Sequence, residues 1–295
     1  MNHAIAATTP WTVPIGAASR AIRRLATLAA ALLGIPLAAA EPKMPIFDAH
    51  IHYSHDAWQS TPPKEAIAIL RKAGLKRAMV SSSSDDGTQM LLAEAPDLII
   101  PALRPYRKRG ETSSWVRDET INAHLEARLK KYRYAAIGEF HVYGTDADLP
   151  VVRRTVQLAK HYGLWLHLHG DSDAVERVLA QDPAARVLWA HSGFDRPEQV
   201  RAMLRKHRQL HADLAFRNDH ATGGKVDPAW REAFMEFPDR FLVGTDTFTP
   251  ERWYYIVEHA DWSRRWLADL PPEIAERIGW RNGETLFTSM MATKP

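Results

Sequence analysis

The sequence predicts an α/β protein, a (β/α)8 TIM barrel with extra C-terminal helices. Short apolar or β-branched runs alternate with amphipathic stretches, and eight such repeats follow one another along the chain. Alternation of strands and helices is typical of a parallel sheet, and eight repeats favour closure of that sheet into a barrel. The length of residues 41–295 also fits, because such barrels typically have about 250 residues.

The predicted strands are short runs, most of which end in polar residues. They are, in chain order, Pro45–His50, Arg77–Ser81, Leu98–Leu103, Tyr134–Phe140, Leu164–His169, Val187–His191, Leu210–Phe216 and Phe241–Asp246. The helices predicted between them are Pro63–Ala73, Ile121–Lys131, Pro150–His161, Asp173–Ala180, Pro197–Lys206, Pro228–Phe237 and Pro250–Trp266. Several begin with proline, which the first turn of a helix tolerates because the missing N–H would be unpaired there. The tail, Pro271–Phe287, is predicted to form one or two further helices packed outside the barrel.

Residues 1–40 differ in composition from the rest of the chain. Three arginines are their only charged residues, and the uncharged run Leu25–Ala40 is rich in alanine and leucine. This run is short for a membrane-spanning helix, which needs about 20 apolar residues, and it ends in the small residues that signal peptidase favours. We therefore expect residues 1–40 to be a signal peptide and residues 41–295 an exported, periplasmic domain with no stable membrane anchor after cleavage. An uncleaved anchor, a misassigned start codon and an organelle transit peptide are the alternatives.

Composition excludes several classes of function. The chain has no cysteine, which rules out disulfide scaffolds, cysteine nucleophiles and thiolate metal sites. The formal charge of +3 comes entirely from residues 1–40, so the remainder is neutral and offers no electrostatic footprint for nucleic acid. Nucleotide-binding glycine loops and the G-x-S-x-G elbow of serine hydrolases are missing from the sequence. We expect a small-molecule substrate, and a homo-oligomer is compatible with the sequence.

Two histidines, His50 and His52, stand at the end of the first predicted strand in the run Phe47–His52. Side chains alternate along a strand, so these two point to the same side. In a barrel that side can be the interior at the C-terminal rim, where active sites lie. Imidazole nitrogens suit Zn2+, Mn2+ or Fe2+, although a single His-x-His motif is common by chance.

Polar residues also stand at the ends of other predicted strands. They are Glu139 on the fourth strand, His169 on the fifth, His191 on the sixth and Asp246 on the eighth. Their spacing follows the length of β-α units, about 30 residues each, which histidines of an ordinary core would not be expected to keep. The pattern predicts a metal centre with one or two divalent ions, with Zn2+ preferred and Mn2+ or Fe2+ as alternatives.

The combination of DAHIH, GEF, HLHG, AHSGF and GTDTF resembles the amidohydrolase superfamily, in particular its amidohydrolase-related branch of metal-dependent TIM-barrel hydrolases. The resemblance extends over Phe47–Phe287. The metal ligands that it implies are His50, His52, His169 and Asp246. It places His191 beside the metal, as a ligand of a second ion or as a residue that polarises the substrate. Many two-metal members carry a carbamylated lysine on the fourth strand, where this chain has Glu139, predicted as a bridge between metals or as a carboxylate contacting the site.

The expected catalytic residues are Asp246 and His191. A bound divalent metal lowers the pKa of its water from about 15.7 towards about 7, and Asp246 is placed to accept a proton from that water and pass it to the leaving group. Arg104 follows the third strand and Arg217 the seventh. Because a guanidinium matches a carboxylate with two parallel hydrogen bonds, we expect these arginines to bind an anionic substrate.

The sequence therefore predicts a metal-dependent hydrolase of a small amide, ester or lactone. One alternative is a metal-dependent decarboxylase of a small carboxylic acid, because the resembling branch also contains decarboxylases. Another is an exported binding protein without catalysis, which the presence of both Asp246 and His191 disfavours. Release of carbon dioxide from substrates would distinguish the decarboxylase from the hydrolase.

Overall fold

The computed structural model describes residues 43–288, and the predicted leader, residues 1–40, lies outside these residues. In the described part, eight parallel strands follow one another around a single sheet in chain order. They are β1 (Ile46–Ile51), β2 (Leu75–Val80), β3 (Ile99–Leu103), β4 (Ala136–His141), β5 (Trp165–His169), β6 (Val187–Trp189), β7 (Leu210–Asp213) and β10 (Phe241–Leu242). The N–H of Ala49 donates to the carbonyl of Val243 at 2.9 Å, which joins β1 to the residue after β10. The predicted barrel is thereby confirmed.

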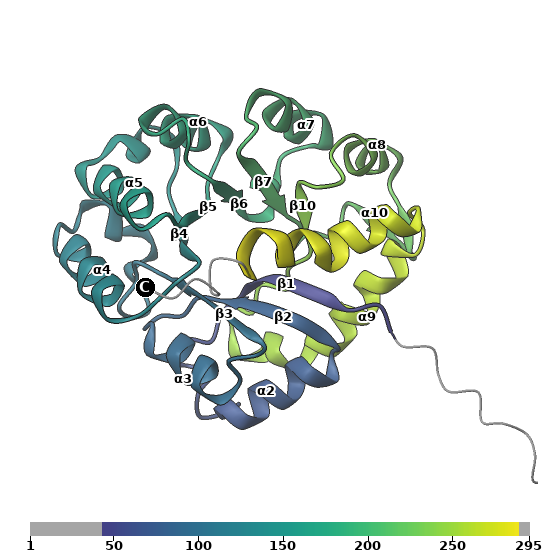
Figure 1. Ribbon diagram of the computed structural model, residues 1–295, viewed down its shortest axis with the longest axis horizontal. Helices are drawn as coiled ribbons and strands as arrows, with labels where there is room; N and C mark the ends of the chain where they lie inside the picture. The colour runs from purple at the N-terminus through teal and green to yellow at the C-terminus, as the bar shows by residue number, and fades with distance from the viewer. Residues whose placement is uncertain (1–42, 289–295) are drawn as a thin grey trace, which may run out of the picture. The chain divides into compact units, whose positions relative to one another are not determined.

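Helices fill the connections and surround the strands, as Figure 1 shows. They are α2 (Pro63–Lys72), α3 (Asp86–Glu94), α4 (Thr120–Lys131), α5 (Pro150–Tyr162), α6 (Ser172–Gln181), α7 (Pro197–Lys206), α8 (Pro228–Glu236) and α9 (Ile256–Leu267). In α5, Pro150 occupies the first turn and Gly163 ends the helix with a left-handed φ of 66°. Its buried residues include Val152, Val156 and Ala159, whose spacing places them on one helix face. No helix within residues 43–288 combines the length and the apolar character needed to cross a membrane.

Three connections differ from the sequence prediction. Between β2 and β3 the structure has the unpredicted helix α3, whose hydrophobic periodicity is weak. The single helix predicted over Pro250–Trp266 is a 3-10 segment, Pro250–Tyr255, followed by α9. A short hairpin, β8 (Ala221–Thr222) with β9 (Lys225–Val226), was also not predicted, because two-residue strands are too short to show alternation.

The C-terminal segment was predicted to pack outside the barrel, but it closes the N-terminal end and inserts Phe287 into the apolar cluster there. It consists of α10 (Pro272–Glu276) and two π-helical turns, Arg277–Arg281 and Glu284–Thr288. The Phe287 ring lies 5.9 Å from the ring of Phe47 and 5.2 Å from that of Trp165, inside an apolar cluster contributed by the strands. Gly283 permits this approach, because a Cβ there would lie 2.2 Å from the Phe47 ring. Apolar burial therefore fills this end of the barrel.

Candidate metal centre

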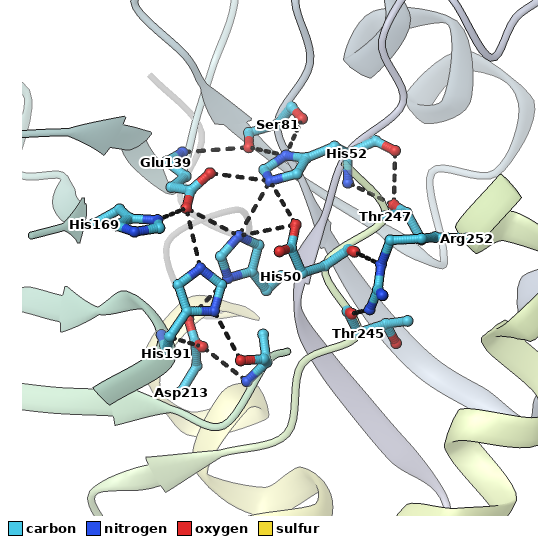
Figure 2. A network of polar contacts seen from close by, with 12 residues as sticks. His50, His52, Ser81, Glu139, His169, His191, Asp213, Thr245, Thr247 and Arg252 are labelled. Atoms are coloured by element: carbon cyan, nitrogen blue, oxygen red, sulfur yellow. Dashed lines mark hydrogen bonds and ion pairs between the residues drawn. The ribbon is translucent and has the colours of Figure 1, made fainter. Parts of the chain in front are cut away.

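The polar residues predicted at the strand ends meet at the C-terminal end of the barrel (Figure 2). They are His50 on β1, His52 just after it, Glu139 on β4, His169 on β5, His191 in the turn after β6 and Asp246 in the loop after β10. All are buried except His169, which is partly exposed. Parallel strands explain the gathering, because their carboxyl ends lie at one end of a barrel.

His50 and His52 direct their Nε2 atoms at each other across 3.1 Å. The Nδ1 of His50 lies 3.1 Å from Oδ2 of Asp213, and the Nδ1 of His52 lies 2.9 Å from the carbonyl oxygen of Ser81. Both oxygens accept hydrogen bonds, so each ring keeps a proton on Nδ1 and, when neutral, presents a lone pair at Nε2. Two facing lone pairs repel each other. The pair therefore requires a proton or a metal cation at this point.

Asp48 fixes the end of β1 from which both histidines project. The register between β1 and β2 shifts between Asp48 and Ile51. Inside this irregular stretch, the Asp48 carboxylate accepts hydrogen bonds from the backbone N–H groups of His50, at 3.0 Å, and Thr245, at 3.1 Å. Burial raises the pKa of Asp48 to about 6, although these hydrogen bonds oppose the increase. The carboxylate thus ties the end of β1 to the segment after β10.

Glu139 links two pairs of histidines. Its Oε2 lies 3.1 Å from Nε2 of His52, and its Oε1 lies 3.5 Å from Nε2 of His50. The same Oε1 lies 2.8 Å from Nδ1 of His169 and 3.4 Å from Nε2 of His191. Arg104 also donates to Oε2, at 2.8 Å. The carboxylate therefore occupies the position between two groups of nitrogen ligands that a bridging residue would need. Glu139, predicted as a bridge between metals or as a carboxylate contacting the site, also lines the cavity above the cluster.

Asp246 carries a buried oxygen that lacks a hydrogen bond. Its Oδ1 lies 3.3 Å from Nε2 of His52 and 3.8 Å from Nε2 of His50, yet among the described residues it has no hydrogen-bond partner. Its backbone has a left-handed φ of 59°, and its N–H donates to the carbonyl of His50 at 2.7 Å. Arg252 donates to the carbonyls of Thr245 and Asp246. Such a firmly held, unpaired carboxylate oxygen is what a metal ligand would offer before binding.

The electrostatics of the cluster favour a bound cation. Burial lowers the pKa of His50, but the negative charges of Asp213 and Glu139 outweigh burial and raise it well above its ordinary value. Burial raises the pKa of Glu139, but His141 and His50 hold it well below its usual range. In the same way His50 and His52 lower the pKa of Asp246 against the effect of burial. The carboxylates therefore stay ionised and attract positive charge.

The residues present fit one or two divalent metals. Ligand atoms lie within 4.8 Å of one another in several groups, which include His50 with His52 and Glu139, and Glu139 with His169 and His191. A further group combines His50, His191 and Asp246. Imidazole nitrogens mixed with carboxylate oxygens suit Zn2+, Mn2+ and Fe2+, and the lone-pair contact and the unpaired oxygen of Asp246 lie at the same point.

Sequence reasoning missed Asp213, which organises the cluster from below. Asp213 lies on β7, accepts from Nδ1 of His50 and from Nε2 of His167 at 2.9 Å, and accepts from the backbone N–H of His191 at 2.8 Å. His167 thus lies one layer below the site. A carboxylate within an apolar strand was the available signal for Asp213. Residues that orient ligand histidines in this way are typical of metal sites.

A cavity of about 400 Å3 opens above the cluster. Arg104 lines it, whereas Arg217 does not belong to its lining. Arg217 is buried, pairs with Asp219 at 2.6 Å and donates to the carbonyls of His191 and Asp195 at 2.9 Å each. Arg104 therefore lines the pocket, whereas Arg217 stabilises the turn that carries His191 through hydrogen bonds to its backbone.

Comparisons with known proteins agree with this architecture. A family model described as amidohydrolase matches residues 102–288. No curated protein matches the sequence. At identities below about one fifth, the structural likenesses that follow show the fold alone.

An uncharacterized TIM-barrel protein from Bordetella bronchiseptica superimposes with a TM-score of 0.57 at 15% identity, over 84% of this chain and 100% of that one. A Pseudomonas putida protein described as a 2-pyrone-4,6-dicarboxylic acid hydrolase gives 0.54 at 14%, over 83% and 98%. A TatD homologue from Escherichia coli K12 gives 0.52 at 19%, over 82% and 98%.

Proposed function

The chain belongs to the amidohydrolase family, and from that premise we propose that it is a metal-dependent hydrolase of a small amide, ester or lactone, acting through metal-activated water. The observation that carries this proposal is the meeting of the two histidine Nε2 atoms with the unpaired Oδ1 of Asp246. A hydrolase needs a Lewis acid and a proton acceptor at one point, and this geometry supplies ligands for the first and a carboxylate for the second.

Two groups of residues would hold the metal. His50, His52 and Asp246 offer ligand atoms on one side of Glu139, and His169 and His191 offer them on the other. Glu139 would bridge two ions, or contact a single one. A divalent ion here, Zn2+ in the first place with Mn2+ or Fe2+ as alternatives, supplies Lewis acidity and lowers the pKa of bound water towards about 7.

Asp246 and His191 perform the proton transfer and the polarisation. The ionised Asp246 carboxylate accepts a proton from the attacking water and returns it to the leaving group. His191 has its Nδ1 2.8 Å from the carbonyl of Ala215, so its Nε2 faces Glu139 and the cavity. From there it polarises the carbonyl of the substrate or binds the second ion.

Arg104 and His141 place hydrogen-bond donors on the wall of the cavity. The hydroxyl of buried Tyr106 accepts from the backbone N–H of His141 at 2.7 Å and lies 2.9 Å from Nδ1 of the same residue. When the hydroxyl donates its own proton to Nδ1, the ring proton of His141 lies on Nε2. With the guanidinium of Arg104, this donor favours an anionic substrate such as a carboxylate. A dicarboxylic acid also appears in the name of the Pseudomonas putida neighbour.

The test is a substrate screen with the protein as purified, after chelation, and after reloading with Zn2+ or Mn2+. We expect hydrolysis of at least one lactone, ester or amide, lost on chelation and restored by metal. Arg104→Ala should lower kcat/KM for an acidic substrate far more than for its neutral ester, whereas Arg217→Ala should lower both alike. Turnover that releases carbon dioxide without hydrolysis would overturn the proposal in favour of a decarboxylase.

We also propose that residues 1–40 direct export to the periplasm and are removed. The basis is the arginine-containing segment followed by the uncharged run ending at Ala40. Expression of the full chain in a Gram-negative host, fractionation and N-terminal sequencing test this. A periplasmic protein beginning at Glu41 is expected, and a cytoplasmic protein that retains Met1 would contradict it.

A further inference from the structure

Three phenylalanines, Phe194, Phe216 and Phe248, line the cavity above the candidate metal centre and remain 50%, 49% and 47% exposed. They come from the segments that follow β6, β7 and β10, three neighbouring strands of the barrel. We call them the phenylalanine wall. Half-exposed aromatic rings gathered at the mouth of a polar site are unfavourable in water. Their grouping therefore requires an explanation beyond packing.

The backbone conformation of two of these phenylalanines is also energetically unfavourable. Phe194 and Phe216 both have a φ of 55°, in the left-handed region that large side chains seldom adopt. Each is held there by its surroundings, and such strained residues cluster at functional sites. A protein that only needed these loops to turn would place glycine or asparagine at these positions. The strain and the exposure together indicate that the rings are presented to a ligand.

The phenylalanine wall directly contacts residues of the candidate metal centre. The Phe194 ring stacks on His191, with centroids 4.7 Å apart and planes 13° from parallel. Phe216 meets Phe194 edge to face at 6.4 Å and Phe248 at 5.4 Å. The guanidinium of Arg252 lies 4.7 Å from the Phe216 ring centre and 5.4 Å from that of Phe248. Because Arg252 also donates to the carbonyl of Asp246, one side chain supports both the wall and a candidate ligand.

Three basic side chains from the segment after β3 line the other side of the cavity. Arg104 pairs with Glu139 at 2.8 Å and Arg109 pairs with Asp56 at 2.5 Å, and the third is Lys108. In the ring of eight strands β3 lies four positions from β7, so this basic segment faces the loop that carries Phe216. The cavity therefore has an aromatic side and a side lined by basic residues, of which Lys108 is one, with the candidate metal centre between them.

We propose that the substrate contains an aromatic or other flat conjugated ring, which stacks on the phenylalanine wall, and an anionic group, which faces Arg104 and Lys108. A flat ring gains from face and edge contacts with half-exposed phenylalanines, whereas a short aliphatic chain leaves them in water. The inference rests on the proposed function only in taking this cavity as the substrate site. It narrows the substrate class to aryl or similarly conjugated acids and their derivatives.

Binding of three carboxylates that share the anionic group tests the proposal. Benzoate, cyclohexanecarboxylate and acetate are titrated calorimetrically into the full-length protein as purified, in parallel with Phe216→Ala and Phe248→Ala variants. We expect benzoate to bind at least tenfold more tightly than acetate and several-fold more tightly than cyclohexanecarboxylate. Each substitution should weaken benzoate at least fivefold and leave acetate unchanged. Tyr254→Ala is the matched control, since Tyr254 is 65% exposed and lies outside the cavity lining.

Several outcomes would overturn the proposal. Equal affinities for benzoate and acetate, or no binding of either, would refute the proposal that the substrate contains a ring. Equal affinities for benzoate and cyclohexanecarboxylate would refute the proposal that this ring is flat. Variants that alter the oligomeric state but not benzoate affinity would assign the wall to a second copy of the chain. Metal content and chelator-sensitive hydrolysis are measured on the same preparations. Absence of both, with benzoate selectivity intact, would refute the proposed function and leave the ring assignment standing.

Discussion

The two ends of the barrel interior are filled by opposite means. At the N-terminal end, Phe47, Trp165 and Phe287 pack against one another in an apolar cluster. At the C-terminal end, histidines and carboxylates meet with facing lone pairs and an oxygen that has no hydrogen bond in the described part of the chain. The first end gains stability from its own apolar contacts, whereas the second brings together groups that a proton or a metal cation between them would stabilise.

Two buried histidines, one near each end of the barrel, have pKa values shifted in opposite directions. His211 lies against Trp165 near the apolar end, and burial lowers its pKa to about 4. Burial acts in the same direction on His50, but Asp213 and Glu139 reverse the effect and raise the pKa of His50 well above its ordinary value. Burial in apolar surroundings favours the neutral form of an imidazole, whereas burial beside carboxylates favours the protonated form. This difference predicts separate responses to mutation, chelation and acid.

The largest expected effect comes from breaking the apolar end. Phe287→Ala removes a fully buried ring and should lower the free energy of unfolding by about 3–5 kcal/mol, because the cavity left behind cannot be refilled by the neighbouring strands. Urea denaturation at pH 7.5 measures it, with exposed Thr285→Ala as the control. An unchanged midpoint would show that the tail does not close the barrel. Metal content per folded chain should stay at the wild-type level.

Chelation should affect only the polar end. A ligand present at about 100 times its Kd stabilises the folded state by about 2.7 kcal/mol, so removing the metal should lower Tm. In the His50→Ala/His52→Ala variant, chelation should leave Tm unchanged, whereas Phe287→Ala should retain the wild-type decrease. Differential scanning fluorimetry with and without chelator makes the comparison. A chelator-induced decrease in the double variant equal to that of wild type would place the metal elsewhere.

The smallest expected effect is the contribution of His211 to the loss of folding stability at acid pH. Its folded pKa of about 4 lies below the unfolded value of about 6.5, so the unfolded state binds more protons between these values and stability falls as pH decreases through that window. The free energy of unfolding decreases from pH 7 to pH 5, and in His211→Leu this decrease should be smaller by about 2 kcal/mol. Denaturation at both pH values tests this, and the exposed His161→Gln should change nothing. An acid sensitivity equal to wild type would contradict the lowered pKa.

The sequence predicted most of the barrel because each β-α unit carries its own local signal. The strand runs and the helices that begin with proline depend on neighbouring residues, and α5 extends only one residue beyond its predicted end. The left-handed turn at His191 and the plug formed by Phe287 depend on contacts between distant segments. Such contacts leave little trace in local periodicity.

The candidate site divides in the same way. Residues that stand at strand ends, such as Glu139 and Asp246, were predicted because strand ends meet in space. Asp213 was not, since its role depends on the ring nitrogens of His50 and His167. Arg217 was expected to face the substrate, but position after a strand does not reveal that Asp219 and two backbone carbonyls occupy its guanidinium.

Elemental analysis of the purified protein tests the central claim most directly. Wild type should contain one or two equivalents of a divalent transition metal per chain, Zn2+ in the first place, and His50→Ala/His52→Ala should lose most of it while circular dichroism shows an intact fold. Wild type that remains metal-free after incubation with Zn2+, Mn2+ or Fe2+, or a double variant with full occupancy, would contradict a metal centre at the C-terminal end of the barrel.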